Sequence, residues 1–455
     1  MELLEKIKKV LDSDRIITEK NQLILYSKDA TSYHEAKVPE LVVFPTNKSE
    51  VSALVSIANE SGVTIIPYGL GTSVEGQIVP LKRSITLDFK LMNKIIEFRP
   101  EDNLIRVQPG VKRRALNDFL QEYKLFFPID PGVDATIGGM AATNASGSNG
   151  LYYGSMKNNI TGLEVVLANG DIIQTGGKTL KSSSGYNLTN LFVGSEGTLG
   201  IFTELTLKIS PLNKHSKSLL VSFGDEAEAV KTALDILGCG LNIRKLEIVD
   251  CNAIEVINSY NGTKLTLSPS LMIEIGGIDQ LIISREFQLL LENLGRVVPF
   301  DNILTYEFEK SEELWSLRRG IALALKSYYK KNVLVTDISV PLSKLPLVFK
   351  ETRIIMDTHN IDGVLIGHVG DGNFHAALVV NDKDTQELAK VKHINDLIID
   401  LAIKNNGTIS GEHGIGIGKR EHLVLEHGAS VEYMKKIKNL FDPNNILNSG
   451  KIFLK

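Results

Sequence analysis

The sequence predicts an α+β fold built from two or more domains. Its 455 residues exceed what one ordinary hydrophobic core covers. Short β-like runs alternate with helical segments, and glycine-rich loops separate them. The composition, with 43% hydrophobic and 23% charged residues, is that of a soluble globular protein. A net charge of −4 gives no electrostatic reason to expect a nucleic acid partner.

Four segments follow from the order of these elements. Residues 1–36 form a helical lead-in whose apolar positions we expect to pack into the core, and residues 406–455 form the C-terminal segment. Residues 37–213 form a first domain, with helices at 48–61 and 113–123 and strands at 41–44, 64–67, 84–87, 104–107, 162–167, 171–175 and 191–193. Residues 214–405 form a second domain, with strands at 218–223 and 271–274 and helices at 226–237, 283–294, 343–356 and 386–405.

The two cysteines and the absence of long apolar runs restrict the class of protein. Cys239 and Cys251 are too few to ligate an iron–sulfur cluster by cysteine alone, and we expect them to be buried free thiols. No run reaches 18 apolar residues, and the N-terminus lacks the apolar centre of a signal peptide. We therefore expect a cytoplasmic protein, with peripheral attachment to a membrane left open.

The run from His368 to His375 is the most informative part of the sequence. Asp371-Gly372 between two apolar runs is a strong hairpin signal. If those two residues form the turn, His368 pairs directly with His375 on one face of the hairpin, with Cβ atoms roughly 4.5–5.5 Å apart. Two imidazoles at that separation can share a divalent metal ion. The alternative is a pair of partly exposed histidines without a ligand.

A second loop supplies the rest of a catalytic metal centre. Glu412, within Gly411-Glu412-His413-Gly414, is a natural third ligand. Three protein ligands leave coordination positions open, which is the pattern of a catalytic site rather than a structural one. Two histidines and a carboxylate suit zinc, manganese or ferrous iron, so the ligand types leave the metal undecided. Lys419 and Arg420, further along this loop, are expected to form a solvated charged turn.

Glycine-rich segments in the first domain predict an anionic, flat ligand. Residues 67–76 follow a strand, and their successive N–H groups are suited to a pyrophosphate. The spacing and the absence of a following helix exclude a Rossmann turn. Residues 130–139, the small-residue run 141–147 and residues 194–201 add further close-approach segments. Tight loop packing is the alternative explanation for each of them.

Seven stretches together resemble the FAD-linked oxidases of the vanillyl-alcohol oxidase type. They are PYGLGTSVEG (67–76), FPIDPGVDATIGGMAATNASG (127–147), GYNLTNLFVGSEGTLGI (185–201), TDISVP (336–341), GHVGDGNFH (367–375), GEHGIGIGKR (411–420) and DPNNILNSGK (442–451). They follow the family's order over residues 40–451. The resemblance is closest to the branch of D-lactate dehydrogenase, the glycolate oxidase flavoprotein subunit and D-2-hydroxyglutarate dehydrogenase, and within it to D-lactate dehydrogenase.

The resemblance implies a two-part FAD-binding domain. It also implies a cap domain with an antiparallel sheet flanked by helices, and a C-terminal tail that returns to the FAD domain. Because residues 67–80 contain no His or Cys, we expect FAD to bind without a covalent bond. The residues expected to contact FAD are Pro67, Tyr68, Gly69, Leu70, Gly71, Thr72, Ser73, Gly76, Pro131, Gly132, Asp134, Ala135, Thr136, Gly138, Gly139, Ala142, Ser146, Gly147, Glu196, Gly197, Gly200 and Ile201.

The same resemblance assigns roles in the cap domain. It implies that His368, His375 and Glu412 bind the metal and that His413 lies beside the flavin as catalytic base. Arg318 would bind the substrate carboxylate, with Arg319 as the reserve choice, and Asn373 would contact the substrate.

The expected reaction is oxidation of a short D-2-hydroxy acid, foremost D-lactate, by hydride transfer to FAD. Val335 stands where D-2-hydroxyglutarate dehydrogenases carry a lysine, which disfavours a dicarboxylate. Glycolate or a broader hydroxy-acid range is the alternative within the family. A quinone, a cytochrome, an electron-transfer flavoprotein or a separate iron–sulfur subunit would accept the electrons, and a homodimer is one open arrangement. A metal-dependent hydrolase and a subunit without activity are the alternatives from other classes.

Overall fold

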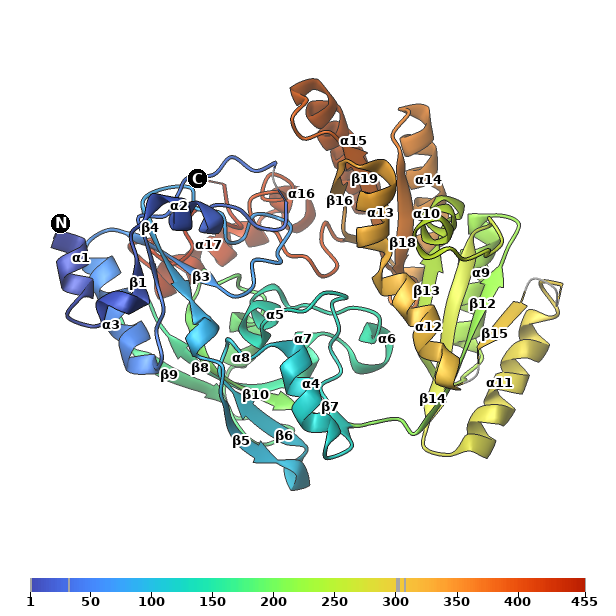
Figure 1. Ribbon diagram of the computed structural model, residues 1–455, viewed down its shortest axis with the longest axis horizontal. Helices are drawn as coiled ribbons and strands as arrows, with labels where there is room; N and C mark the ends of the chain where they lie inside the picture. The colour runs from blue at the N-terminus through green and yellow to red at the C-terminus, as the bar shows by residue number, and fades with distance from the viewer. Residues whose placement is uncertain (1, 32, 300–302, 307, 455) are drawn as a thin grey trace. The chain divides into compact units, whose positions relative to one another are not determined.

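The computed structural model describes residues 2–31, 33–299, 303–306 and 308–454 (Figure 1). The chain divides into two compact units. Unit 1 contains residues 1–146, 153–212 and 412–455, and unit 2 contains residues 147–152 and 213–411. The expected lead-in and most of the C-terminal segment fall in unit 1, whereas the domain boundaries drawn from the sequence remain predictions.

Unit 1 begins with a four-stranded sheet in the order β1-β2-β4-β3. Strands β2 and β3 both run parallel to β4, and β1 is antiparallel to β2. Leu3, Ile7 and Leu11 of the lead-in are buried in one core with helix α3, which confirms the expected core packing. The elements are α1 (Glu2–Ile7), β1 (Ile16–Ile17), α2 (Lys20–Leu23), β2 (Leu41–Val43), α3 (Lys48–Glu60), β3 (Thr64–Tyr68) and β4 (Ser84–Asp88).

A five-stranded antiparallel sheet in the order β5-β6-β10-β8-β9 forms the second half of unit 1. Helices α4, α5, α7 and α8 contribute to its buried core. The strands are β5 (Ile95–Arg99), β6 (Leu104–Val107), β8 (Ile160–Val166), β9 (Ile172–Gly176) and β10 (Ile201–Lys208), and β7 (Leu125–Phe126) pairs with β11 (Ser210–Pro211). The helices are α4 (Arg113–Gln121), α5 (Ile137–Thr143), α7 (Met156–Asn159) and α8 (Leu188–Phe192), and the short helix α6 (Gly150–Tyr153) falls mostly in unit 2.

The strand expected at residues 191–193 is wrong, because helix α8 occupies this part of the chain. The side chain of Asn187 caps the helix by accepting a hydrogen bond from the backbone N–H of Asn190 at 3.0 Å. Phe192 is completely buried and packs edge-on against Phe441. An apolar run of this length does not distinguish a strand from one helical turn, and the cap decides for the helix.

The C-terminal tail returns to unit 1, as the resemblance implied. The backbone N–H of Ile65 in β3 donates to the carbonyl of Ile446, and that of Asn448 donates back to Ile65, both at 2.8 Å. The helices before this point are α16 (Leu423–His427) and α17 (Ser430–Phe441). Single turns of 3₁₀-helix occur in both units, at Ser13–Arg15, Ile24–Tyr26, Phe89–Leu91, Pro100–Asp102 and Leu342–Lys344.

Unit 2 is built on an antiparallel sheet in the order β15-β12-β14-β13-β18-β19-β16, with β17 also pairing with β19. Its strands are β12 (His215–Ser222), β13 (Ile243–Val249), β14 (Ser270–Gly277), β15 (Ile303–Tyr306), β16 (Asn332–Val335), β17 (Ile338–Ser339), β18 (Gly363–His368) and β19 (Asn373–Val380). Its helices are α9 (Glu226–Gly238), α10 (Cys251–Asn261), α11 (Gln280–Leu294), α12 (Phe308–Arg319), α13 (Ile321–Tyr329), α14 (Leu345–Thr358) and α15 (Thr385–Lys404).

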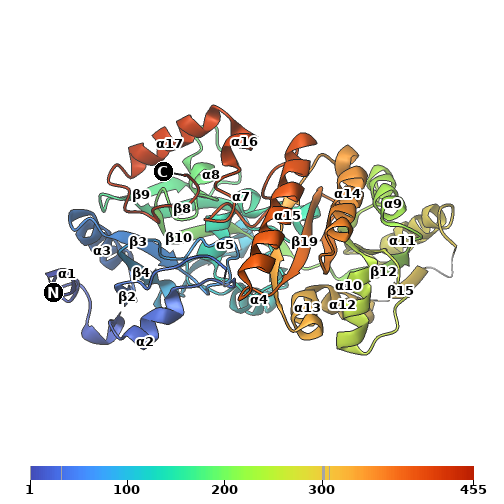
Figure 2. The ribbon, with the colours of Figure 1, turned by 90° about the horizontal axis from the view of Figure 1, so that it is seen from above.

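Helices cover both faces of this sheet. Figure 2 shows α10, α12 and α13 on one side and α9, α11 and α14 on the other. The first group shares a core with Leu220, Val249 and Met272, whose side chains project from the same face of the sheet. Alternation along β18 and β19 puts His368 and His375 on this face too, because Val364 and Ala377 belong to the same core. The two histidines of the predicted metal site therefore lie on the face of the sheet that α12 covers.

The structure also bears on the expected state of the two cysteines and on the expected lack of a membrane-spanning segment. Cys239 and Cys251 are both free, but Cys239 is exposed and Cys251 is only partly buried, so the expected burial of the two thiols is wrong. Cys239 follows the last residue of α9, at the exposed end of that helix. Among the described residues, no helix combines the length and the hydropathy that crossing a membrane requires.

Candidate functional site

The loop after β3 in unit 1 offers a run of unpaired backbone donors. Within the described part of the chain, the N–H groups of residues 69–74 donate to no protein acceptor. The pairing resumes at Glu75 and Gly76, whose N–H groups bind the side chains of Gln77 and Asp29. Gly71 and Gly76 adopt left-handed conformations, with φ of 70° and 76°. Consecutive free N–H groups in a turn of this kind form an anion-binding nest.

The other glycine-rich segments of unit 1 converge on this loop. A Cβ on Gly69 would lie 2.2 Å from Oγ1 of Thr136, and one on Gly197 would lie 2.5 Å from Cγ of Pro67. The backbone N–H groups of Gly194 and Glu196 donate to the carbonyls of helix α5, at Ala141 and Ala142. The structure thus brings the four predicted cofactor segments together through contacts that only small residues permit.

This arrangement fits FAD. The free N–H groups of residues 69–74 suit a pyrophosphate. At the glycines of these segments no side chain covers the main chain, so a ligand can approach the backbone closely. The hydroxyls of Ser73 and Ser195 are buried and bind no acceptor among the described residues, so they add two polar groups suited to a ligand. Asp134 differs from this group, because its carboxylate accepts the N–H of Arg114 at 3.1 Å.

The loop that carries His413 is fixed to the same part of unit 1. The side chain of Gln77 donates to the carbonyl of His413 at 2.7 Å. The carboxylate of Glu196 accepts the N–H groups of Ile415 at 2.6 Å and Gly416 at 2.8 Å. A Cβ on Gly416 would lie 2.0 Å from the carbonyl of Glu75, so this contact requires glycine. His413 is therefore held next to the predicted cofactor segments.

Glu196 has a structural role that the sequence did not reveal. It is fully buried, and burial raises its pKa to about 7 against the lowering effect of the two backbone hydrogen bonds. Its backbone is left-handed, with φ of 53°. Its carboxylate holds the loop at residues 415–416, so a contact with FAD would come from its backbone.

The expectation of a solvated turn at Lys419 and Arg420 is wrong. Lys419 is 1% exposed and forms an ion pair with Glu75 at 3.3 Å. Arg420 donates to the carbonyl of Gly450 at 2.8 Å. Lys451, also buried, donates to the carbonyl of Val79 at 2.6 Å, and burial lowers its pKa to about 7. These contacts join the loop to the returning tail, which sequence periodicity does not predict.

In unit 2 the hairpin forms, but with another register than expected. His368 pairs with Asn373, and His375 pairs with Ile366. Four residues form the turn, because Val369 is fully buried and Gly370 packs so closely on Leu151 that a Cβ would lie 2.7 Å from its Cδ2. A shift of two residues keeps both histidines on one face. Their ring centroids lie 5.6 Å apart and their planes are nearly perpendicular, at 87°.

Glu247, on β13, connects His368 to Arg318. Its Oε1 accepts from Nδ1 of His368 at 2.5 Å. Its Oε2 accepts from Nε of Arg318 at 3.0 Å and from Nη2 of Arg318 at 2.9 Å. Burial alone would raise the pKa of Glu247, but the charges of His368 and Arg318 and hydrogen bonds from His368 and Ser148 hold it below its usual range. The carboxylate is therefore ionised, and Nδ1 of His368 carries the proton.

His375 is oriented in a similar way. Its Nδ1 donates to the carbonyl of Thr336 at 3.3 Å, and the carboxylate of Asp337 lies 3.6 Å from the same atom. Asp337 also accepts from Asn373 and Ser410, at 2.8 Å each. With Nδ1 as the donor, Nε2 carries the lone pair in the neutral form of each ring, and this is the form that a metal ion requires.

The structure distinguishes the two candidate arginines at the end of α12. Arg318 is largely buried and lies against the sheet through Glu247. Arg319 pairs instead with Glu312, an exposed residue of its own helix. Arg318 is thus the arginine on the histidine side of the sheet, and its contact with Glu247 uses Nε and Nη2. Asn373 uses its amide N–H groups on Asp337 and on the carbonyl of Ile338, so only its oxygen remains for a substrate.

Glu412 and His413 begin the last segment of unit 1, whereas His368, His375, Arg318 and Asn373 lie in unit 2. The role of Glu412 as third ligand stays a prediction. Glu247 and Asp337 were missed from the sequence, because an isolated acidic residue in a strand is usually solvated. A signal for the burial of Glu247 was available in the sequence. Apolar residues flank it, with Leu246 before it and Ile248 and Val249 after it, and such a run indicates a buried strand.

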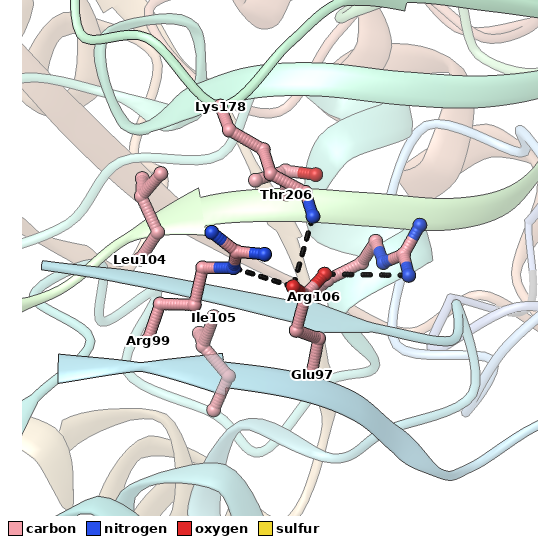
Figure 3. A pocket seen from close by; sticks show the side chains of 7 residues that line it. All are labelled: Glu97, Arg99, Leu104, Ile105, Arg106, Lys178 and Thr206. Atoms are coloured by element: carbon pink, nitrogen blue, oxygen red, sulfur yellow. Dashed lines mark hydrogen bonds and ion pairs between the residues drawn. The ribbon is translucent and has the colours of Figure 1, made fainter. Parts of the chain in front are cut away.

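A shallow depression on unit 1 lies apart from the predicted site residues. Figure 3 shows Arg99, Arg106 and Lys178 around the carboxylate of Glu97, on strands β5 and β6 and after β9. Lys178 binds Glu97 at 2.8 Å and Arg106 binds it at 3.3 Å. The basic groups are neutralised by that carboxylate, by Glu204, which pairs with Arg106, and by Asp102, which pairs with Arg99. Nothing in this cluster suggests chemistry.

Family comparisons agree with the geometry in both units. Residues 39–176 match an FAD binding domain, and residues 212–452 match the C-terminal domain of FAD linked oxidases. A probable mitochondrial D-lactate dehydrogenase of Danio rerio is 39% identical over 92% of this chain and 86% of its own. The mitochondrial D-lactate dehydrogenase (cytochrome) of Arabidopsis thaliana is 35% identical over 99% of this chain and 80% of its own.

Two further comparisons complete the assignment. The glycolate oxidase subunit GlcD of Bacillus subtilis is 36% identical over 95% of this chain and 92% of its own. A crystal structure of p-cresol methylhydroxylase with substrate bound superposes with a TM-score of 0.82 at 19% identity, over the whole of this chain and 96% of that one, and so shares the fold. The cofactor segments of unit 1 and both domain matches lead to one conclusion: this chain belongs to the FAD-linked oxidase family and is an FAD-linked oxidoreductase.

Proposed function

We propose that this chain uses noncovalent FAD and a divalent metal ion to oxidise a short D-2-hydroxy acid, with D-lactate to pyruvate as the leading reaction. The observation that carries the proposal is the histidine pair of unit 2. His368 and His375 lie 5.6 Å apart by ring centroids, and each directs Nδ1 to an acceptor of the protein. The relatives named D-lactate dehydrogenase support the substrate class.

Glu412 is proposed as the third metal ligand. Gly411, the last residue of unit 2, packs against the hairpin so closely that a Cβ would lie 2.1 Å from Nδ2 of Asn373. Asn373 is the register partner of His368. Consecutive Cα atoms are about 3.8 Å apart, so Glu412 starts within one residue of the hairpin. This covalent link supports a ligand set of two histidines and one carboxylate, which suits zinc, manganese or iron.

Arg318 and Val335 support a short monocarboxylate as substrate. Nη1 of Arg318 is available to bind a carboxylate, while Glu247 fixes the rest of the guanidinium. Val335, at the end of β16, supplies no charge for a second carboxylate. Asn373 would contact the substrate through its amide oxygen, because both of its amide N–H groups bind protein acceptors.

The residues divide the reaction between them. Arg318 orients the substrate carboxylate, and His413 takes the proton of the α-hydroxyl. A divalent metal bound at the histidines supplies Lewis acid chemistry that eases this deprotonation. FAD supplies the acceptor for the hydride that leaves Cα. The substrate thereby loses one proton and one hydride and becomes a 2-oxo acid. A quinone, a cytochrome, an electron-transfer flavoprotein or a separate iron–sulfur subunit then takes the electrons.

Oxidation of glycolate is the second candidate function. The relative named glycolate oxidase subunit GlcD, which aligns with nearly the whole chain, favours it specifically. Glycolate lacks the methyl group of lactate, so the two candidates differ only in what the site places beside the substrate Cα.

Anaerobic bleaching of the flavin absorption near ~450 nm tests the substrate. We expect D-lactate to bleach FAD fastest in a panel with L-lactate, glycolate and D-2-hydroxyglutarate. Faster bleaching by glycolate would replace the leading reaction by the second candidate. A yellow protein bleached by none of the four contradicts the proposed activity.

Metal analysis of the same preparation tests the metal. We expect about one divalent ion per chain and loss of bleaching after chelation, with recovery when zinc or manganese is returned. His375→Ala should lose the ion yet keep FAD, because His375 belongs to unit 2 and all the predicted FAD-binding residues except Gly147 belong to unit 1. Full activity in a preparation verified to be free of metal would contradict this part of the proposal.

A further inference from the structure

Glu247 is a buried carboxylate of unit 2 that binds a predicted metal ligand and the predicted substrate arginine. It contacts His368 through Oε1 and Arg318 through Oε2. It is fully buried on β13, and it lies on the same face of the sheet as Met272, its register partner. Burying an ionised carboxylate costs free energy unless the carboxylate is fully paired. The contacts with His368 and Arg318 therefore stabilise Glu247 in this buried position.

We propose that Glu247 is a positioning residue that fixes the metal ligand His368 and the substrate-binding Arg318 together. The inference rests on the proposed function, since it presupposes a metal at His368 and a substrate carboxylate at Arg318. By accepting from Nδ1 of His368, Glu247 holds the tautomer in which Nε2 carries the lone pair. By accepting from Nε and Nη2 of Arg318, it fixes the plane of the guanidinium and leaves Nη1 outside this contact.

Only a carboxylate meets both requirements. His368 and Arg318 both present N–H groups, so both oxygens at position 247 must accept. A glutamine offers one acceptor and one donor. If its oxygen binds Arg318, its NH₂ group faces Nδ1 of His368 and stabilises the tautomer with the proton on Nε2, which cannot bind a metal. If its oxygen binds His368, Arg318 loses its partner and its orientation.

Glu247→Gln therefore separates positioning from direct contact. We expect metal affinity of the FAD-loaded enzyme to fall by about 10- to 100-fold, measured by competition with a chromophoric zinc chelator. We also expect KM for D-lactate to rise and FAD content to stay unchanged. Arg318→Lys is the partner test. It should raise KM but leave metal affinity within about threefold of the original, since the metal ligand keeps its carboxylate.

Glu274→Gln is the matched control. Glu274 lies on the neighbouring strand β14, on the same face, and is buried with a basic partner, Lys245 at 3.2 Å. It also accepts a hydrogen bond from Ser218 at 3.4 Å, and neither partner is a predicted ligand residue. Metal affinity and KM should therefore stay at their original values in this variant.

The outcomes distinguish this inference from the proposed function. An unmodified chain that binds no metal contradicts the proposed function itself. A metal-binding chain in which Glu247→Gln keeps the original metal affinity and KM overturns the inference alone. If Glu247→Gln does not fold, ¹⁵N spectra of the histidine rings in the unmodified holoenzyme show which ring nitrogen of His368 carries the proton. The signals of His368 are assigned as those that disappear in the variant His368→Gln. A proton on Nδ1 supports the proposal, and a proton on Nε2 overturns it.

Discussion

Glu97 in unit 1 and Glu247 in unit 2 have similar partners in different surroundings. Glu97 binds Lys178, Arg99 and Arg106, and hydrogen bonds first from Lys178 and then from Arg99 lower its pKa to about 2. Glu247 binds Arg318 and His368, and its pKa is lowered as well. Glu97 lies at the surface of its sheet, whereas Glu247 is fully buried.

Burial, rather than the number of basic partners, decides what each glutamate can do. Glu97 and its basic partners are only partly buried, so water screens their charges and ion pairs of this kind stabilise little. Around Glu247 no water competes, and breaking one contact leaves a buried group without its partner. The same side chain therefore forms a surface cluster in unit 1 and an orienting contact in unit 2.

The largest expected effect comes from His413, whose backbone is held in unit 1 by Gln77. His413→Asn keeps this backbone contact and removes the base. We expect kcat with D-lactate to fall by about 10²- to 10⁴-fold while FAD and metal contents stay unchanged. Stopped-flow reduction of the flavin measures this directly. Near-normal reduction by the loaded variant would show that another group takes the proton.

The two arginines of α12 repeat the comparison between a buried and an exposed ion pair within one helix. Arg318→Lys replaces a planar fork by a single ammonium group, and we expect kcat/KM to fall by about 10- to 100-fold. Arg319→Lys alters an exposed pair with Glu312 and should leave kcat/KM within about twofold. Steady-state kinetics of both variants test the difference. Equal losses in the two would contradict the assignment of Arg318.

Glu196 adds a third case, a buried glutamate held by backbone N–H groups. Burial raises its pKa from 4.5 to about 7. A group with a raised folded pKa stabilises fully below its unfolded pKa, and this contribution is lost as pH rises through the folded value. From pH 4.5 to 7 the stability of unit 1 should thus decline because of Glu196, with a slope of up to about 1.4 kcal/mol per pH unit.

Glu196→Gln should remove this slope. Lys451 does not interfere, because its pKa is lowered from 10.5 to about 7 and its own effect, a rise of stability with pH, lies above pH 7. The measurement is the midpoint of thermal flavin release at several pH values, taken as the difference between the original chain and the variant. If that difference does not change between pH 4.5 and 7, the raised pKa of Glu196 is wrong.

Much of this organisation was predictable from residues that repeat a local pattern. Glycine-rich segments predicted the cofactor side of unit 1, because close approach requires glycine wherever the segments meet, as at Gly69 and Gly197. Alternation predicted that His368 and His375 share a face. The register was wrong by two residues, since the buried Val369 and the contact of Gly370 with Leu151 widen the turn.

The partners of the predicted residues were not predictable in the same way. Glu247 is 121 positions from His368, and Lys419 is far along the chain from Glu75. Such pairs depend on which strands become neighbours, and β13 lies beside β18 only in the folded sheet. A single charged residue has the same local pattern whether it is solvated or buried with a partner. The sequence therefore indicates the residues proposed to bind ligands better than the residues that orient them.

The smallest expected effect tests the exposed end of the comparison. Glu97→Gln removes the carboxylate that Arg99, Arg106 and Lys178 share (Figure 3). All three basic groups can then be solvated by water, because they are partly exposed. We expect the midpoint of thermal flavin release to shift by no more than about 2 °C and kcat/KM to stay unchanged. Since the three basic groups then lie together without Glu97, any loss should be larger at low ionic strength. A large loss of stability at physiological salt would show that partner number matters more than burial, and the distinction between Glu97 and Glu247 would have to be abandoned.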